Sequence, residues 1–232
     1  MTTSALFVEE TRFGNWFINT DMWRVHVLRR ALNDLQRMLP NGQAARAKVL
    51  DVGCGFGHSF NELAQRFGPE LLVGLDADPH LQQRAGEAAQ ECTAKVSLHS
   101  ANAARTGLPD AGFDLVFCHQ TFHHIVDQQA AMAEFFRVLK PGGVLLFAES
   151  TKRYITSLPI RVLFRHPMEV QKTAPEYLAI IRGAGFDLPE ERVSLPYLWW
   201  SRPDLGFLEW IGRPVPNSRE ETLVNAVAIK PV

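Results

Sequence analysis

The chain has 232 residues, 46% of them hydrophobic and 21% charged, which suits one α/β domain with a sizeable core. Its formal net charge of −1 at pH 7 gives no strong field for nucleic acid or anionic membranes. Because no secretion-signal pattern opens the chain and no apolar run approaches the roughly 18 residues that span a bilayer, we expect a cytoplasmic protein without a transmembrane segment.

The first predicted element is a helix over residues 21–39, where apolar side chains recur at helical spacing. A short apolar strand, Lys48–Val52, follows it and carries one acid, Asp51. Glycines then alternate with other residues over 53–57, before a segment over 58–67 that suits a helix. Glycine can take positive φ, so a ligand can lie against bare backbone at such a turn.

The spacing of these glycines separates two kinds of nucleotide site. A nicotinamide-binding turn follows the pattern G-x-G-x-x-G, which places a diphosphate on the helix N-terminus. Here the third glycine is Gly57, and the position that the dehydrogenase pattern requires is His58. With Asp51 before the turn, the pattern favours a ligand that has a positive charge and no phosphate.

A second buried strand, Leu71–Asp76, ends in an acid. Asp76 follows the glycines at close to the roughly 20-residue offset at which a carboxylate reaches a ribose in such folds. We expect Asp78 to cap the next helix, with Pro79 as its first residue. Asp76 is then free to accept hydrogen bonds from the vicinal hydroxyls of a ligand.

Strands and helices alternate along the rest of the chain, which predicts a doubly wound parallel sheet with helices on both faces. The lysine, proline and glycines of residues 140–143 are expected to stop a helix. The expected elements are helix 79–91, strand 94–99, strand Phe113–His119, helix 128–139, strand 144–149, helix 177–184, and strands 193–200 and 223–230.

Four segments together resemble the class I methyltransferases of the "type 11" family, which includes methylases of quinone and lipid biosynthesis. They are residues 49–57, 108–116, 123–125 and 136–143. The resemblance covers about residues 47–149 and the closing strand. It implies a Rossmann-like sheet of seven strands, S-adenosylmethionine as the cofactor, and a small-molecule substrate. It says almost nothing about which substrate.

The resemblance also implies roles for single residues. Asp76 would hold the ribose, Ala77 would pack on the adenine, and Asn102 and Ala103 would reach the adenine amine. The family usually has aspartate where this chain has Asn102, which keeps an acceptor oxygen but loses the charge. The backbone around His119 would lie near the methionine moiety. The residues implied to contact the methionine end are Asp51, Gly53, Cys54, Gly55 and Gly57.

Methyl transfer from a sulfonium mainly requires a positioned acceptor in a dry pocket, and a base only where the acceptor must lose a proton. Candidate acid–base groups are His119, His123 and Glu149, and all three lie at or just after the ends of strands, at the expected ligand-binding edge. The alternative for His123 and His124 is a role in packing the loop. For Glu149 the alternative is a solvated strand end. His119 is the leading candidate, with an ordinary pKa near 6.5.

No metal site is expected. The three cysteines, Cys54, Cys92 and Cys118, form no C-x-x-C pair, and the sequence spacing reveals no His/Cys ligand cluster. Reduced thiols are the simplest interpretation.

We expect a cap over residues 1–46, a cofactor-binding core over 47–150, and completion of the sheet with substrate-side insertions over 151–232. All five tryptophans lie outside the core, at positions 16, 23, 199, 200 and 210. They can line an apolar pocket or pack accessory helices onto the sheet. Basic and apolar side chains mix over 153–166, so peripheral membrane contact is an open alternative.

The leading hypothesis is an S-adenosylmethionine-dependent methyltransferase that acts on a small, apolar or aromatic metabolite at an O, N or C centre. A nicotinamide-dependent oxidoreductase and a non-catalytic S-adenosylmethionine-binding module remain alternatives. A nucleic-acid methylase is a weaker branch, because it would carry a basic face and an Asn/Asp-Pro-Pro-aromatic motif after the fourth strand. The sequence leaves the oligomeric state and the accepting atom open.

Overall fold

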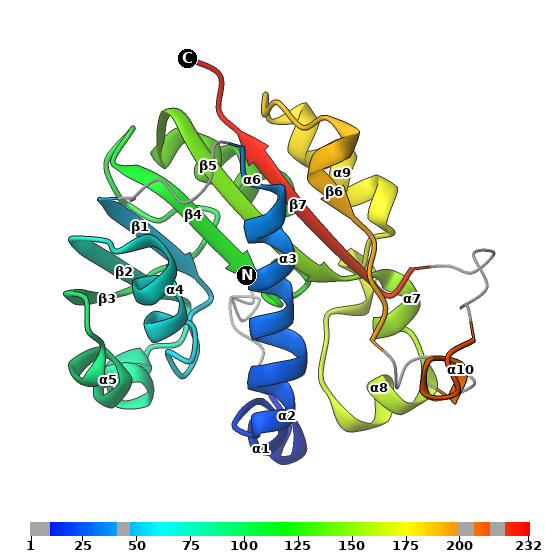
Figure 1. Cartoon of the computed structure of the whole chain (residues 1–232). Helices are drawn as coiled ribbons and strands as arrows, with labels where there is room; N and C mark the ends of the chain where they lie inside the picture. Colours follow the sequence, from blue (N-terminus) through cyan, green and yellow to red (C-terminus); the bar gives the residue numbers. More distant parts are fainter. Residues whose placement is uncertain (1–9, 41–46, 199–206, 214–220) are drawn as a thin grey trace, which may run out of the picture.

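The computed structural model describes residues 10–40, 47–198, 207–213 and 221–232. In this part of the chain, seven strands form one sheet in the order β3-β2-β1-β4-β5-β7-β6 (Figure 1). The strands are β1 Lys48–Val52, β2 Leu71–Asp76, β3 Val96–Ser100, β4 Phe113–His119, β5 Leu139–Ser150, β6 Val193–Ser194 and β7 Leu223–Ile229. The expected seven-stranded, Rossmann-like architecture is confirmed.

The expectation of a fully parallel sheet needs one correction. β1 to β5 pair in parallel, whereas β7 pairs antiparallel with both β5 and β6. β7 lies between β5 and β6 and is buried along almost its whole length. A strand that is covered on both faces reads as an apolar run in either direction, so the sequence pattern cannot reveal its orientation.

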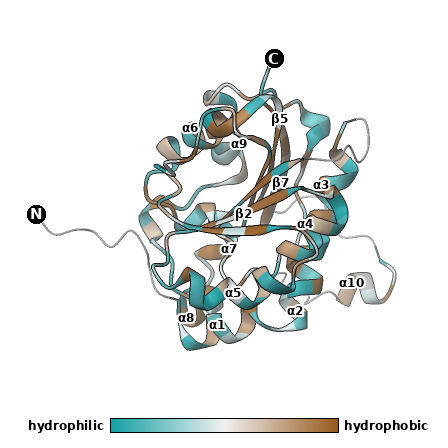
Figure 2. Cartoon of the chain, turned by 90° about the vertical axis from the view of Figure 1, so that its left-hand side faces the viewer, coloured by the Kyte–Doolittle hydropathy of each residue, from teal (hydrophilic) through white to brown (hydrophobic). Residues whose placement is uncertain are grey.

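Helices cover both faces of the sheet, as expected. α3 (Arg30–Met38), α4 (Phe60–Phe67) and α5 (Leu81–Glu91) pack their apolar side chains on one face, with Leu32 and Phe60 fully buried. α6 (Gln128–Val138) and α9 (Ala174–Gly183) cover the opposite face around Tyr177. Figure 2 shows apolar residues concentrated on the central strands and hydrophilic residues on the outer sides of the helices.

The predicted helix over residues 21–39 is continuous but irregular. It begins as α2 (Asp21–Trp23), passes through a π-helical stretch, Arg24–Arg29, and continues as α3. A separate helix, α1 (Arg12–Ile18), precedes it, and the Thr11 side chain caps α1 by accepting from the Gly14 N–H. Single π-helical turns occur frequently at functional sites.

Three other boundaries differ from the prediction. α5 begins at Leu81 because Asp78 accepts from the His80 N–H at 2.8 Å in a turn instead of capping the helix. β5 begins at Leu139, which pairs with Phe113 of β4, so the residues expected to be only a helix stop extend the strand; the Gly142 N–H donates to the carbonyl of Lys230, just after β7. α9 begins at Ala174, after a capping box made by Thr173 and Glu176.

β6 ends at Ser194, so the strand expected over 193–200 is short, and its last two residues lie outside the described part. Small helices follow β5 and β6 near the carboxyl edge of the sheet. They are α7 (Lys152–Ile155), α8 (Leu158–Leu163) and α10 (Phe207–Trp210), together with a 3-10 turn at Met168–Val170. Further 3-10 turns lie at Phe122–His124, after β4, and at Glu190–Arg192, before β6. Within the described ranges, no helix combines the length and apolarity needed to cross a bilayer.

Candidate functional site

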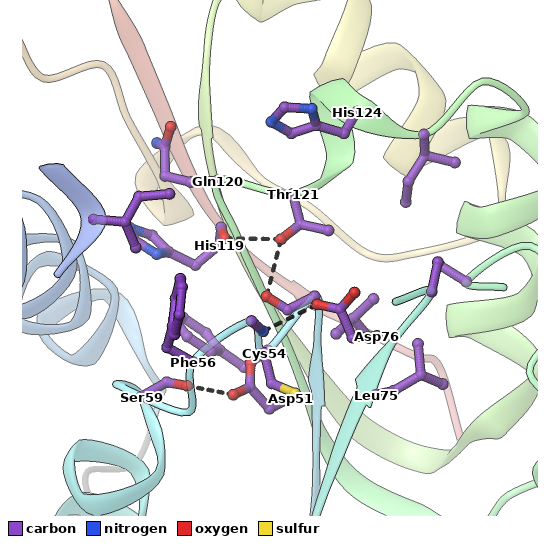
Figure 3. Close-up of a pocket in the computed structure, with 18 of the residues that line it drawn as sticks. Asp51, Cys54, Phe56, Ser59, Leu75, Asp76, His119, Gln120, Thr121 and His124 are labelled. Carbon is purple, nitrogen blue, oxygen red and sulfur yellow. Dashed lines mark hydrogen bonds between the residues drawn. The ribbon is translucent and has the colours of Figure 1, made fainter. Parts of the chain in front are cut away.

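A cavity of about 530 Å³ lies at the carboxyl ends of β1, β2 and β4 (Figure 3). This is the edge at which open α/β sheets bind ligands, and the volume falls in the range of roughly 300–1,000 Å³ that is typical of small-molecule sites. Its walls include the glycine-rich turn, the end of β2, the loop after β3, the loop after β4, and the segment around α1 and α2. The predicted cofactor residues that line it are Asp51, Gly53, Cys54, Gly55, Asp76, Ala77, Asn102, Ala103 and His119. Gly57 is the one predicted cofactor residue absent from this wall.

The glycine-rich turn presents bare backbone to the cavity. Gly53 and Gly55 take φ of +73° and +52°, a conformation that other residues adopt only at a cost. A Cβ on Gly53 would lie 2.0 Å from Thr121 Oγ1, so the loop after β4 fills that space. A Cβ on Gly55 would meet no atom within 4 Å, because Gly55 faces the open cavity.

The carboxylate of Asp76 is not free, contrary to expectation. Its Oδ2 accepts from the Gly55 N–H and its Oδ1 from the Asp78 N–H, each at 3.0 Å. The side chain therefore fixes the glycine turn to the end of β2. Each carboxylate oxygen has a second lone pair, and Asp76 lines the cavity, so it can still accept from a ligand (Figure 3).

Asp51 is buried and accepts a hydrogen bond from the Ser59 hydroxyl. Burial raises the pKa of Asp51 to about 7, the nearby Asp76 charge adds to the rise, and the Ser59 hydrogen bond opposes it. A cation was the expected partner for this side chain, and in this structure its partner is a neutral hydroxyl. A positively charged ligand in the cavity would favour the ionised form.

His119 lies at the end of β4 and is 7% exposed. Its ring stacks on Phe117 with centroids 5.7 Å apart and meets the edge of Trp23 at 5.5 Å. Burial, with a smaller contribution from His123, lowers the pKa of His119 to about 3, so the expected pKa near 6.5 is wrong and the ring is neutral at pH 7. Within the described residues its Nε2 atom has no hydrogen-bond partner.

Glu149 and His123 do not line the cavity. Glu149 is fully buried, so the solvated strand end considered for it is wrong. Its Oε1 accepts from the N–H groups of Thr121 and Phe122 at 2.7 and 2.5 Å, and its Oε2 lies 2.5 Å from His123 Nδ1. Glu149 therefore shapes the loop that follows β4, and His123 is its partner.

His124, next in the chain, does line the cavity, at the end away from Asp51 in Figure 3. The side chains of His123, His124 and His166 pack together, although the sequence spacing revealed no such cluster. Burial lowers the pKa of His124 well below its ordinary value and that of His166 to about 3.

The segment before the sheet closes the cavity on one side. Glu10, Asn15, Ile18 and Trp23 line it. Glu10 also accepts from the Arg165 N–H at 3.0 Å, so the segment at α1 contacts the segment after α8. α1 and α8 both lie in the lower part of Figure 1, and Figure 2 shows them side by side at the bottom.

Aromatic rings strengthen this contact. Phe164 packs edge-on against Phe13 and Phe17, with centroids 5.6 and 5.8 Å apart. The tryptophans contribute less to the cavity than expected, because Trp16 is 61% and Trp210 is 82% exposed and neither lines it. Trp199 and Trp200 lie outside the described residues.

Several lining residues carry no sequence motif and were missed. His58 Nε2 lies 2.9 Å from Asn19 Oδ1, and burial lowers the pKa of His58 to about 4. The Arg84 guanidinium lies over the Phe56 ring at 5.0 Å and contacts Asp78 at 2.9 Å. The further lining residues that the sequence did not indicate are Gln120, Thr121, Val126 and Asp127. Their position directly after β4 is the only local signal for them.

Comparison with known proteins finds similarity to methyltransferases. A family model described as "Methyltransferase domain" matches residues 50–147. The chain is 32% identical over 153 residues to a probable S-adenosylmethionine-dependent methyltransferase of Mycolicibacterium smegmatis, covering 64% of this chain and 55% of the relative. It is 35% identical over 154 residues to a demethylmenaquinone methyltransferase of Deinococcus radiodurans, covering 64% of this chain and 61% of the relative.

The fold is also similar to that of a solved phosphoethanolamine N-methyltransferase 2 of Haemonchus contortus, in complex with S-adenosyl-L-methionine. The TM-score is 0.65 at 18% identity, over 96% of this chain and 60% of that one. The chain spans between a quarter and about three fifths of the length of the curated relatives it matches.

Proposed function

We propose that this chain, whose residues 50–147 belong to the type 11 family of class I S-adenosylmethionine-dependent methyltransferases, transfers a methyl group to a small, largely apolar metabolite. The observation that carries the proposal is the cavity itself. At the ligand-binding edge of the sheet, it joins a bare glycine turn, the carboxylates of Asp51 and Asp76, and a far wall of mixed apolar and polar side chains. The comparisons support the cofactor, and the substrate is our inference.

The residues present fit S-adenosylmethionine. The Gly55 backbone, with open space where a side chain would stand, accommodates close approach of the methionine end. Asp51, whose pKa of about 7 leaves it ready to ionise beside a cation, suits a ligand with an ammonium and a sulfonium. Asp76 has lone pairs for the ribose hydroxyls, and Ala77, Asn102 and Ala103 line the adenine end.

The acceptor would bind beyond the sulfonium, in the part of the cavity that the N-terminal segment covers. Its wall there combines apolar side chains with polar groups that can orient a substrate. The lining residues of this part are Ile18, Trp23, Leu28, Ile125 and Val126, with Glu10, Asn15, Gln120, His124 and Asp127 as the polar groups. This composition supports an apolar or aromatic acceptor with one polar end.

Bound S-adenosylmethionine supplies an activated methyl group, so this chain mainly has to bind, orient and exclude water. His119 is neutral, and at a pKa of about 3 it is a weak proton acceptor. We assign it to the wall that positions the reacting centre. Asp127 and Glu10 are the lining carboxylates of the acceptor side that can accept a proton from a hydroxyl acceptor.

Relatives narrow the substrate class without identifying it. The matched proteins are described as acting on demethylmenaquinone, tocopherol and phosphoethanolamine. The acceptor wall of this chain carries apolar side chains and the carboxylates of Glu10 and Asp127, so it fits a neutral quinol or phenol better than a phosphorylated amine, whose phosphate is anionic. We therefore expect O- or C-methylation of a reduced quinone or a phenol.

Incubation of the full chain with methyl-labelled S-adenosylmethionine and a panel of quinols, phenols and phosphobases tests this proposal. Label transfer to a quinol or phenol supports it, and transfer only to a phosphobase contradicts the substrate class. Calorimetry with S-adenosylhomocysteine and NAD tests the cofactor separately. Binding of NAD alone would support the oxidoreductase alternative, and S-adenosylhomocysteine binding without transfer to any acceptor would support the non-catalytic module.

A further inference from the structure

Three histidines from two separate segments meet beside the cavity. His123 and His124 follow β4, and His166 follows α8. Their ring centroids lie 4.3 Å apart for His123 and His124, 5.1 Å for His123 and His166, and 4.9 Å for His124 and His166. One ring nitrogen from each lies within 4.8 Å of the other two.

We propose that His123, His124 and His166 bind a divalent transition-metal ion of the Zn²⁺ type. Imidazole nitrogen is a preferred ligand of Zn²⁺, with Zn–N distances of about 2.0–2.1 Å, which places tetrahedral ligand nitrogens about 3.4 Å apart. The three nitrogens, which lie within 4.8 Å of one another, therefore need to close by up to about 1.4 Å, and rotations of the side chains can supply this.

Glu149 gives the cluster the second layer of contacts that metal-binding histidines usually have. Its Oε2 lies 2.5 Å from His123 Nδ1, so Nε2 is the nitrogen that His123 can offer to a metal. A histidine ligand that donates its other ring N–H to a carboxylate has a fixed orientation and a more basic ligand nitrogen. Because Glu149 is fully buried, this contact is held within the core.

A buried glutamine holds the two backbone segments in register. The Gln171 side-chain amide donates to the His123 carbonyl at 2.8 Å and to the Pro167 carbonyl at 2.7 Å. Pro167 directly follows His166, so the same amide joins the backbone on both sides of the cluster. The backbone positions of the ligands are therefore set by the fold before a metal binds, and only the side chains have to adjust.

The proposed site also touches the cavity, because His124 belongs to both. Three protein ligands leave one tetrahedral position open, which is the arrangement of catalytic rather than structural zinc sites. Water or an oxygen or sulfur atom of a bound molecule can take that position. The metal would then join the loop after β4 to the segment after α8 at the cavity wall.

Titration of the tag-free full chain with Co²⁺ and Zn²⁺ tests the proposal. We expect one equivalent of Co²⁺ to give the visible absorption of a tetrahedral site, and one equivalent of Zn²⁺ to displace it and raise the melting temperature. His166→Gln should abolish the spectrum because it removes one ligand. Since His166 is half-buried, we expect the fold to tolerate its replacement. His26→Ala is the matched control, because His26 is exposed and outside the cluster.

Glu149→Gln distinguishes an ordered site from fortuitous binding. We expect it to lower Zn²⁺ affinity by about 10–100-fold while keeping the one-equivalent stoichiometry. Absence of the tetrahedral spectrum in the unmodified chain would overturn the proposal without any variant. So would a folded His166→Gln protein, verified by circular dichroism, that binds Co²⁺ as tightly as the unmodified chain.

Discussion

The carboxylate of Asp76 accepts a hydrogen bond from the backbone N–H of Gly55 at 3.0 Å. The side chain that we assign to the ribose therefore also fixes the turn that we assign to the methionine end. A site that is organised before binding loses less conformational entropy when the ligand arrives. The geometry of the two ends of the cofactor site is thus coupled through one acid.

Asp76→Ala should weaken S-adenosylhomocysteine binding by about 1.5–3 kcal/mol, the range for hydrogen bonds to a charged group. Asp76→Asn should lose less, because the amide keeps one acceptor oxygen. Calorimetry of both variants measures this, with Asp21→Ala as the control, since the Asp21 side chain is 91% exposed. Unchanged affinity in Asp76→Ala would remove Asp76 from the cofactor site.

The two glycines of the turn should respond differently to alanine. Gly55→Ala should cost about 1–2 kcal/mol for its left-handed φ, leave the fold intact, and abolish tight cofactor binding, since the new Cβ enters the cavity. Gly53→Ala should destabilise the protein more, because its Cβ would lie 2.0 Å from Thr121. Denaturant unfolding and calorimetry separate the two effects. Equal loss of stability in both variants would contradict this assignment.

For the three strands nearest the site, the sequence predicted the first and last residues correctly. β1, β2 and β4 occur with their expected bounds because each is an apolar run ended by glycine or a polar residue, which fixes its length locally. The side of the cavity that we assign to the cofactor follows from these three strands, since their carboxyl ends meet at one edge.

Contacts between distant segments could not be predicted in this way. The burial of Glu149 depends on hydrogen bonds from two backbone N–H groups in the loop after β4. The sequence around an acid at a strand end does not indicate such distant partners. The histidine cluster brings His166 to His123 across more than 40 residues. The short helix α1 closes the cavity through contacts with Phe164 and Arg165, which its own sequence does not indicate.

Asp51 should make cofactor binding depend on pH. Its pKa of about 7 means that it is protonated below neutral pH in the free protein, so a ligand with an ammonium group must displace that proton. S-adenosylhomocysteine affinity should therefore fall by up to about tenfold per pH unit below 7. 5′-Methylthioadenosine lacks the ammonium and should show no such slope, and Asp51→Asn should remove the slope. Parallel slopes for both ligands would contradict the role of Asp51.

The ionisation of Asp51 should also make the free energy of unfolding depend on pH. The pKa of Asp51 is raised from 3.8 in the unfolded chain to about 7, so between these values the folded state binds more protons than the unfolded state. The contribution of Asp51 to the free energy of unfolding therefore falls as pH rises from about 4 to 7, by about 4 kcal/mol at most. Denaturant titrations across this pH range should show that the free energy of unfolding falls less steeply with rising pH in Asp51→Asn than in the unmodified chain.

His119 should not act as the general base. With a pKa of about 3, it contributes no ionisation near pH 6.5 to the profile of kcat/KM. His119→Gln should leave the shape of that profile unchanged and lower kcat by less than about tenfold, whereas loss of a general base costs about 10²–10⁴. A profile that loses an ionisation near pH 6.5 in His119→Gln would restore the catalytic role.

Removal of residues 1–19 should separate cofactor binding from turnover. The deletion takes away Glu10, Asn15 and Ile18 from the cavity wall and exposes Phe164, but it leaves the glycine turn and Asp76 in place. We expect a folded protein with nearly unchanged S-adenosylhomocysteine affinity, because none of the residues that we assign to the cofactor lies in the deleted segment. Turnover should fall steeply, since an open pocket admits water and loses part of the acceptor wall. Trp16→Ala is the control, because Trp16 lies in α1, is exposed and does not line the cavity, and it should keep full activity. Full turnover in the truncated protein would show that the acceptor does not bind under this segment.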